Sequence, residues 1–185
     1  SQLTFTGMIL LFIFLLPSVL SSTLFHNVRR KAEINSRLSD KASPLILDGP
    51  AAGNGWATQN LDHFDSNNKI TWKQQFYYNN AYQKADSNVN VLYLSGEEPA
   101  TSTLVSAGGQ VDYAMKLNAP IYALEHRFYG KSKPTGDASL ENLKYLSSRQ
   151  AVEDVAYFIR QMNEDKEGDQ KWIVIGGSYT GIVPS

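Results

Sequence analysis

The stretch that decides the fold is Trp172–Gly181, which reads WIVIGGSYTG. Its first four residues are aromatic, apolar and β-branched, a pattern typical of a buried strand, and two glycines then lead into a serine. A serine at a tight turn between a strand and a helix needs small neighbours, because the turn brings the flanking residues against the sheet. Gly176 and Gly177 meet that need, so the stretch predicts a turn that exposes the hydroxyl of Ser178 as a nucleophile.

The amide of Tyr179 follows this serine at the predicted start of a helix. In that place it would donate to an oxyanion, and the helix dipole would also favour negative charge. A glycine turn that only opens a helix is the alternative interpretation, because the strict Gly-x-Ser-x-Gly pattern requires glycine where Thr180 stands.

Strands and helices alternate in the residues before this turn. Sequence patterns predict strands at Ile70–Tyr78, Val89–Leu94 and Ile121–Leu124, and helices at Thr103–Leu117 and Ser147–Met162. Strands joined by helical crossovers favour a parallel sheet with helices on its faces, which is an α/β fold. The first, aromatic strand is expected to be antiparallel or at a sheet edge.

The two predicted helices each have an apolar side. We expect the first to bury Leu104, Val105, Val111, Ala114 and Met115, and the second to bury Val152, Val155, Ala156, Ile159 and Met162. Ser147 and Gln150 have the spacing of a capping box, in which each side chain bonds to the amide of the other residue.

Functional side chains in α/β folds follow the carboxyl ends of strands. After Leu94 comes the segment Ser95–Pro99, in which the amide of Glu97 is a candidate second oxyanion donor. A plain surface turn is the alternative. The adjacent carboxylates of Glu97 and Glu98 diverge and have no third ligand nearby, so metal or glycosidase chemistry is not favoured.

The segment after Leu124 reads EHRFYGKS and ends like a phosphate-binding loop. We expect no nucleotide here, because the first glycine of that pattern falls on Glu125 and the next side chains are too bulky to fold their amides around phosphate. His126 precedes Ser178, whereas the base of a hydrolase follows its nucleophile, so His126 is predicted to be structural. His63 is expected to be a hydrogen-bonding turn residue.

Nine consecutive apolar residues, Met8–Leu16, precede a run of small and polar residues. A spanning helix needs ~20 apolar residues, whereas the core of a secretory signal needs only ~7 to 15. We therefore predict a signal peptide over 1–22, with an uncleaved anchor as the alternative. Residues 23–57 are expected to be a linker or pro-segment, and 58–185 the folded domain.

The composition excludes several classes of function. The 185 residues carry 17 Lys and Arg against 18 Asp and Glu, a net charge of −1, which supplies no basic field for nucleic acid. The chain contains no cysteine, so a disulfide scaffold, a thiolate metal site and a cysteine nucleophile are excluded.

Four stretches together carry a family resemblance. They are QNLDHF at 59–64, LEHRFYGKS at 124–132, SLENLKYLSSRQA at 139–151 and GGSY at 176–179. In this order they resemble the prolyl-carboxypeptidase-like serine peptidases, the family that contains lysosomal Pro-Xaa carboxypeptidase, dipeptidyl peptidase II and thymus-specific serine protease. The likeness runs from Gln59 to Gly181.

The resemblance implies an α/β-hydrolase fold, a Ser-Asp-His triad, delivery through the secretory pathway to the outside or the lysosome, and cleavage of peptides next to proline without a cofactor. It implies that Ser178 is the nucleophile and that the amides of Tyr179 and Glu97 bind the oxyanion. No stable membrane anchor is expected. Carboxypeptidase or dipeptidyl peptidase action and the oligomeric state both stay open.

The sequence departs from the family at three points. Only seven residues follow Ser178, so the acid and the histidine of the triad are expected beyond Ser185, and the chain is expected to be an N-terminal fragment that is inactive by itself. Glu98 stands where the resemblance predicts glycine, and Pro184 would remove an amide early in the next helix. The alternative function is that of a secreted binding or decoy module.

Overall fold

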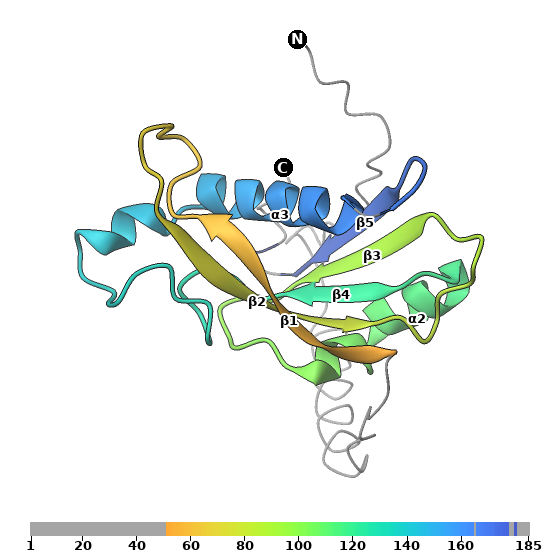
Figure 1. Cartoon of the computed structure of the whole chain (residues 1–185). Coiled ribbons are helices and arrows are strands. Elements are labelled where there is room, and N and C mark those ends of the chain that lie inside the picture. Colours follow the sequence, from red (N-terminus) through yellow and green to blue (C-terminus); the bar gives the residue numbers. More distant parts are fainter. Residues whose placement is uncertain (1–50, 165, 178–179, 181–185) are drawn as a thin grey trace, which may run out of the picture. The chain divides into compact units, whose positions relative to one another are not determined.

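The structure is a computed structural model that describes residues 51–164, 166–177 and 180. The signal peptide expected over 1–22 and most of the expected linker lie outside these residues, as do Ser178, Tyr179 and Pro184. The described residues form a mixed sheet with helices on both of its faces (Figure 1). This is the α/β architecture that the alternating pattern predicts.

The sheet has five strands in the order β1-β2-β4-β3-β5. The strands are β1 Ala52–Asn60, β2 Thr71–Asn79, β3 Val89–Leu94, β4 Ile121–Leu124 and β5 Lys171–Gly176. Strand β3 pairs in parallel with both β4 and β5, whereas β2 pairs antiparallel with both β1 and β4. The predicted parallel pairing is confirmed for the last three strands. Strand β2 is antiparallel as predicted but lies inside the sheet, because β1 covers its outer side.

Strand β1 is the element that the sequence patterns missed, since residues 52–57 fell within the expected linker. Gly53 and Gly55 pair with Tyr78 and Phe76 across the ladder. A Cβ at Gly55 would lie 2.6 Å from the Phe76 ring, and a Cβ at Gly53 would lie 2.9 Å from the Tyr78 hydroxyl oxygen. The two glycines make room for two aromatic rings, which explains why a glycine-rich stretch forms a strand here.

Two apolar clusters lie on opposite faces of the sheet. On one face, helix α3 (Ser148–Asn163) packs Phe158 against even-numbered residues of β3 and β4. On the other face, helix α2 (Gly109–Leu117) and the short 3₁₀ helix η1 (Ser102–Val105) pack against the odd-numbered residues. Alternate residues of the central strands are thus buried on both sides, which explains their continuous apolar runs.

Helix α3 begins where the sequence predicts. Ser147 is its N-cap, and the Ser147 Oγ accepts a hydrogen bond from the Gln150 amide at 3.2 Å. The second half of the predicted capping box is wrong, because the Gln150 side chain donates to Asp62 at 2.6 Å and accepts from the His63 amide at 3.0 Å. This side chain therefore ties the loop after β1 to the start of the helix.

The structure differs from the predicted helices in the extent of the first helix and in which residues of both helices face inward. The helix expected over Thr103–Leu117 is divided, because Gly108, with φ of +105°, separates η1 from α2. Met115 and Val152, both expected to face inward, are 47% and 38% exposed. The inward face of α3 is rotated relative to the predicted one and includes Asp154, which is 1% exposed and is paired with the buried Arg127.

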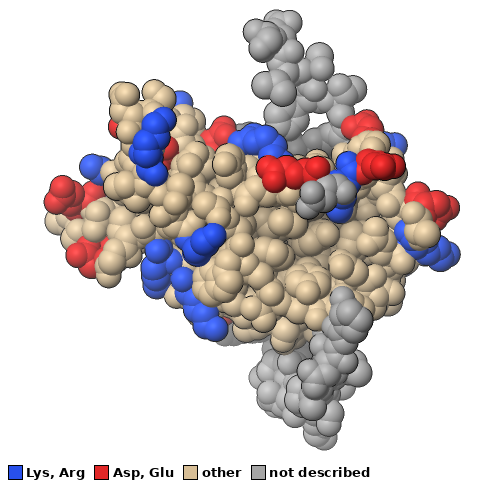
Figure 2. Space-filling view, in the orientation of Figure 1, with Lys and Arg blue, Asp and Glu red and all other residues tan. Residues whose placement is uncertain are grey.

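Figure 2 shows side chains of both signs on one face, with several Lys and Arg side chains near its lower left, and uncharged residues cover most of that face. The presence of both signs agrees with the nearly balanced composition of the chain. No helix within the described ranges is long and apolar enough to cross a membrane.

Candidate active site

The carboxyl ends of β3, β4 and β5 lie next to one another. Leu94 is in register with Leu124 on one side and with Gly176 on the other. The three segments that the sequence singled out therefore start from one edge of the sheet, which is where parallel strands place functional groups.

The turn after β5 is held together by Thr180. Its buried Oγ1 accepts from the Gly177 amide at 3.2 Å, and it donates toward the Gly177 carbonyl at 2.8 Å and the Leu94 carbonyl at 3.4 Å. The departure from glycine at this position thus links the turn to the end of β3. Ser178 and Tyr179, the predicted nucleophile and oxyanion donor, lie outside the described residues, and their roles stay predictions.

The loop after β3 starts from a fixed position. The Ser95 amide donates to the Leu124 carbonyl at 3.0 Å, and the Ser95 Oγ accepts from the His126 amide at 3.3 Å. Glu97 and Glu98 follow on the exposed part of the loop. The oxyanion role of the Glu97 amide stays a prediction.

The segment after β4 folds around its own carboxylate. Glu125 is 1% exposed, and its Oε2 accepts from the amides of Lys131 and Ser132 at 2.9 and 2.8 Å and from the Ser132 Oγ at 2.6 Å. Gly130 has φ of +49°, and a Cβ there would overlap Glu125 Oε1. The amides that would bind phosphate in a phosphate-binding loop donate here to the Glu125 side chain.

His126 is buried among backbone and aromatic groups. Its Nδ1 lies 2.8 Å from the Arg127 carbonyl oxygen, and its ring meets the Tyr129 ring at a steep angle with centroids 5.4 Å apart. Burial lowers the pKa of His126, while the hydrogen bond to the Arg127 carbonyl acts in the opposite direction. The neutral imidazole is therefore the favoured form near neutral pH.

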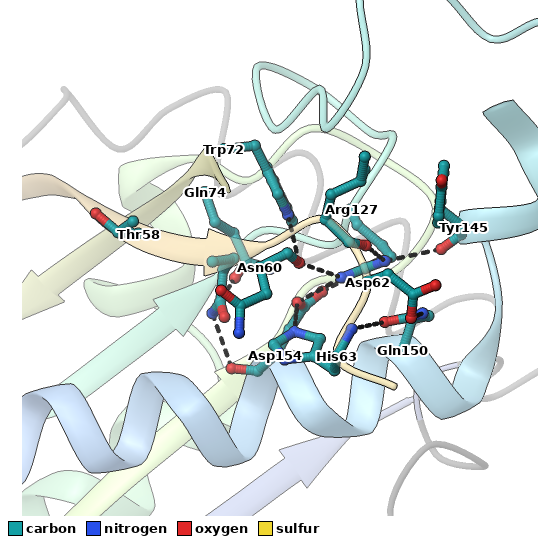
Figure 3. Close-up of polar contacts among 12 residues, drawn as sticks. Thr58, Asn60, Asp62, His63, Trp72, Gln74, Arg127, Tyr145, Gln150 and Asp154 are labelled. Atoms are coloured by element: carbon teal, nitrogen blue, oxygen red, sulfur yellow. Dashed lines mark hydrogen bonds and ion pairs between the residues drawn. The ribbon is translucent and has the colours of Figure 1, made fainter. Parts of the chain in front are cut away.

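A buried ion pair between Arg127 and Asp154 lies beside this edge (Figure 3), and the sequence analysis did not predict it. Arg127, 0% exposed, donates from Nε to Asp154 Oδ2 at 2.6 Å and from Nη2 to Asp154 Oδ1 at 2.7 Å. His63 Nε2 lies 2.8 Å from the same Oδ1. Arg127 Nη1 also donates to the carbonyl of Tyr145 at 2.8 Å. This two-point pairing fixes α3 to the segment after β4.

The polar contacts continue into the sheet through two glutamines. Gln59 Nε2 donates to Gln74 Oε1 at 2.7 Å and to the Asp154 carbonyl at 2.9 Å, and Gln74 Nε2 donates to the Glu125 carbonyl at 2.7 Å. One signal for this network is present in the sequence. Asp154 interrupts the apolar side of a helix, and a carboxylate in that position requires a buried partner.

A cavity of about 10 Å³ lies at the same edge. Its walls are formed by Gln74, Leu94, Ser95, Leu124, Glu125, His126, Arg127, Ala151, Asp154, Val155 and Thr180. This volume is close to the space that a single water molecule needs.

Comparison with known proteins links this edge to a peptidase family. Residues 59–185 match the family model described as serine carboxypeptidase S28. The chain is 46% identical over 130 residues to the putative serine protease K12H4.7 of Caenorhabditis elegans, covering 68% of this chain and 25% of that protein. It is 35% identical over 139 residues to the thymus-specific serine protease of Mus musculus, covering 73% and 27%.

The human lysosomal Pro-X carboxypeptidase is 33% identical over 130 residues, which cover 68% of this chain and 26% of that enzyme. The chain spans about a quarter of the length of the curated relatives it matches. The matched family region begins at Gln59 in β1 and includes all three strand ends of the candidate site. By this match, the chain belongs to the serine carboxypeptidase S28 family.

Proposed function

We propose that the protein acts as a serine peptidase with Ser178 as its nucleophile and the backbone amides of Tyr179 and Glu97 as oxyanion donors. The observation that carries this proposal is the family match over residues 59–185, which includes the glycine-rich turn after β5. The register of β3 and β5 supports it, because the loop that contains Glu97 and the turn that contains Ser178 leave the sheet side by side.

The reaction that follows from this proposal is acyl transfer in two stages. A histidine base takes the Ser178 proton while the Oγ attacks the peptide carbonyl carbon, and the two amides bind the resulting oxyanion. The carbon–nitrogen bond then breaks, and the base returns its proton to the leaving amine. Water attacks the acyl-enzyme by the same route and releases the acid.

The substrate class that we propose is a peptide cut next to proline, by carboxypeptidase or dipeptidyl peptidase action. The support is that a relative at 33% identity is named lysosomal Pro-X carboxypeptidase. The same relative and the apolar run Met8–Leu16 support delivery through the secretory pathway, with cleavage of a signal over 1–22 and a linker or pro-segment between this signal and the domain.

We further propose that residues 58–185 are the first part of a longer peptidase domain. The support is that relatives are about four times as long as the matched region, which covers 25% of the first of them. The acid and the base of the triad would then lie beyond Ser185. Residues 1–185 alone should hydrolyse no peptide, because a serine without a base is not activated.

The test is covalent labelling of the full-length protein with a fluorophosphonate, which reacts with activated serines. The expected result is labelling of the wild type, loss of labelling in Ser178→Ala, and normal labelling in Ser66→Ala, a matched change at an exposed serine. Cleavage of proline-containing peptides from either terminus then identifies the exopeptidase type. Labelling that persists in Ser178→Ala would contradict the assignment of Ser178 as the nucleophile, whereas a wild type that never labels would contradict the peptidase proposal and favour a binding or decoy module.

A further inference from the structure

The Glu125 carboxylate has hydrogen-bond donors on both of its oxygens. The Oε1 accepts from the Ala100 amide at 3.0 Å, and the Oε2 accepts from the two amides and the hydroxyl described above. The Ser132 Oγ accepts from the Gln75 amide at 2.9 Å, so its own proton is directed at Glu125. Every neighbour in this set donates, so both oxygens of the Glu125 side chain act as hydrogen-bond acceptors.

The two oxygens hold two different loops. Oε2 holds the turn at Gly130–Ser132, whereas Oε1 holds the end of the loop after β3 through Ala100. These loops are separated by more than a helix and a strand along the chain, so a single buried side chain connects them. The short carboxylate is well suited to this, because each oxygen accepts several hydrogen bonds at once.

The loop after β3 is therefore anchored at both ends by consecutive residues of one segment. At its start, the Ser95 Oγ accepts from the His126 amide, and at its end the Ala100 amide donates to Glu125. Between these anchors the loop contains Glu97, which is exposed. The direction of the Glu97 amide depends on both anchors, since the intervening residues have no helix or strand to hold them.

We propose that Glu125 is a positioning residue that, through Ala100, holds the Glu97 amide in place to bind the oxyanion. This inference rests on the proposed peptidase function and assigns a task to a side chain that does not touch the reacting atoms. Glu125→Gln should disturb it, because the amide group replaces one accepting oxygen by a donor and leaves one of the two loops facing an unmatched N–H.

The test compares Glu125→Gln with Ser132→Ala in the full-length protein. Ser132→Ala removes a donor to Oε2 but leaves the bond between Oε1 and the Ala100 amide intact. We expect Glu125→Gln to slow fluorophosphonate labelling and kcat by roughly 10- to 100-fold, less than the ~10²- to 10³-fold lost when an oxyanion donor is removed, with KM changed by no more than about twofold. Ser132→Ala should label within about threefold of the wild-type rate, although it also loses stability.

Hydrogen exchange over residues 95–101 supplies a readout that is independent of catalysis. Exchange should become faster in Glu125→Gln and stay near the wild-type rate in Ser132→Ala. Glu125→Asp, whose shorter side chain reaches only one loop, serves if Glu125→Gln fails to fold. Equal labelling rates in the wild type and folded Glu125 variants, or equal slowing in Ser132→Ala, would overturn the proposal. Failure of the peptidase proposal appears separately, as a wild type that never labels.

Discussion

Helix α3 contacts two regions of opposite character along one face. Its first turns meet a polar region, which consists of Gln59, His63, Gln74, Arg127, Gln150 and Asp154. Its later turns meet an aromatic region, which consists of Phe76, Tyr122, Phe158 and Trp172. In the aromatic region the Phe158 ring centroid lies 5.2 to 6.3 Å from the three other rings.

The difference shows what each kind of contact can specify. Apolar burial is non-directional, so the aromatic region stabilises the packing of the helix on the sheet without fixing one atom against another. The paired bonds between Arg127 and Asp154 fix both distance and orientation. The polar region lies at the edge where the loops of the candidate site begin, and these loops need defined positions.

The largest effect is expected from removing the centre of either region. Asp154→Ala leaves the buried Arg127 without its counter-charge and should lower the free energy of unfolding by about 3–5 kcal/mol. Phe158→Ala should cost about the same, 3–5 kcal/mol, through a cavity and lost burial. Both are measured by urea unfolding of the expressed protein.

Replacing both partners of the ion pair should show whether the polar region contributes mainly to stability or to the positions of the loops. The double variant Arg127→Met, Asp154→Leu should recover most of the stability lost in Asp154→Ala, because no unpaired charge stays buried. It should nevertheless leave the loop that contains His63 less protected from hydrogen exchange. A double variant as unstable as the single one would show that the ion pair itself stabilises the fold.

An intermediate effect is expected from Gly55→Ala on strand β1. The new Cβ would meet the Phe76 ring at 2.6 Å, and that ring also packs against Phe158, so overpacking should cost about 1–3 kcal/mol. Gly136→Ala is the matched control, since a Cβ there has nothing within 4 Å. Equal thermal midpoints for the two variants would contradict the role assigned to the glycine and ring pair.

The smallest effect is expected in the pH dependence of stability. Because burial lowers the pKa of His126, the unfolded chain binds a proton before the folded protein does as the pH falls. Stability is complete above the usual histidine pKa of about 6.5, falls as the pH decreases toward the lowered value, and is constant below it.

His126→Asn should remove this part of the acid sensitivity. Urea midpoints of wild type and variant, compared across that pH range, isolate it from the other titrating groups. The charges of Asp154, Arg127 and Glu97 also act on His126, but they are the same in both proteins. Parallel pH profiles would show that His126 does not carry the effect.

The sequence predicted the parts of the fold that depend on continuous or periodic apolar patterns. Strands β3, β4 and β5 and the N-cap of α3 at Ser147 were placed correctly. Strand β1 was missed, because local patterns cannot show that Gly53 and Gly55 receive rings from another strand. The ion pair between Arg127 and Asp154 was missed for a similar reason, since its partners are 27 residues apart and meet only after folding.

For the candidate site, too, the sequence predicted the position in the fold but not the side-chain contacts. The three strand ends were identified and do meet at one edge, because parallel pairing dictates that arrangement. The sequence analysis predicted that Glu125 is incompatible with a phosphate-binding loop. It did not predict that Glu125 accepts hydrogen bonds from two loops. The carboxylate of Glu125 prevents phosphate from binding in this turn, and it also accepts the hydrogen bonds that the turn's amides donate.

The chain contains three tryptophans, and their surroundings differ. Trp72 is 6% exposed and lies beside Arg127 with 5.6 Å between the guanidinium carbon and the ring centroid, Trp172 is 3% exposed in the aromatic region, and Trp56 on β1 is 47% exposed. An indole in contact with water emits at longer wavelengths than a buried one. Variants that keep one tryptophan each would therefore give separate optical signals for the two regions, and fluorescence could show whether they unfold together or in sequence.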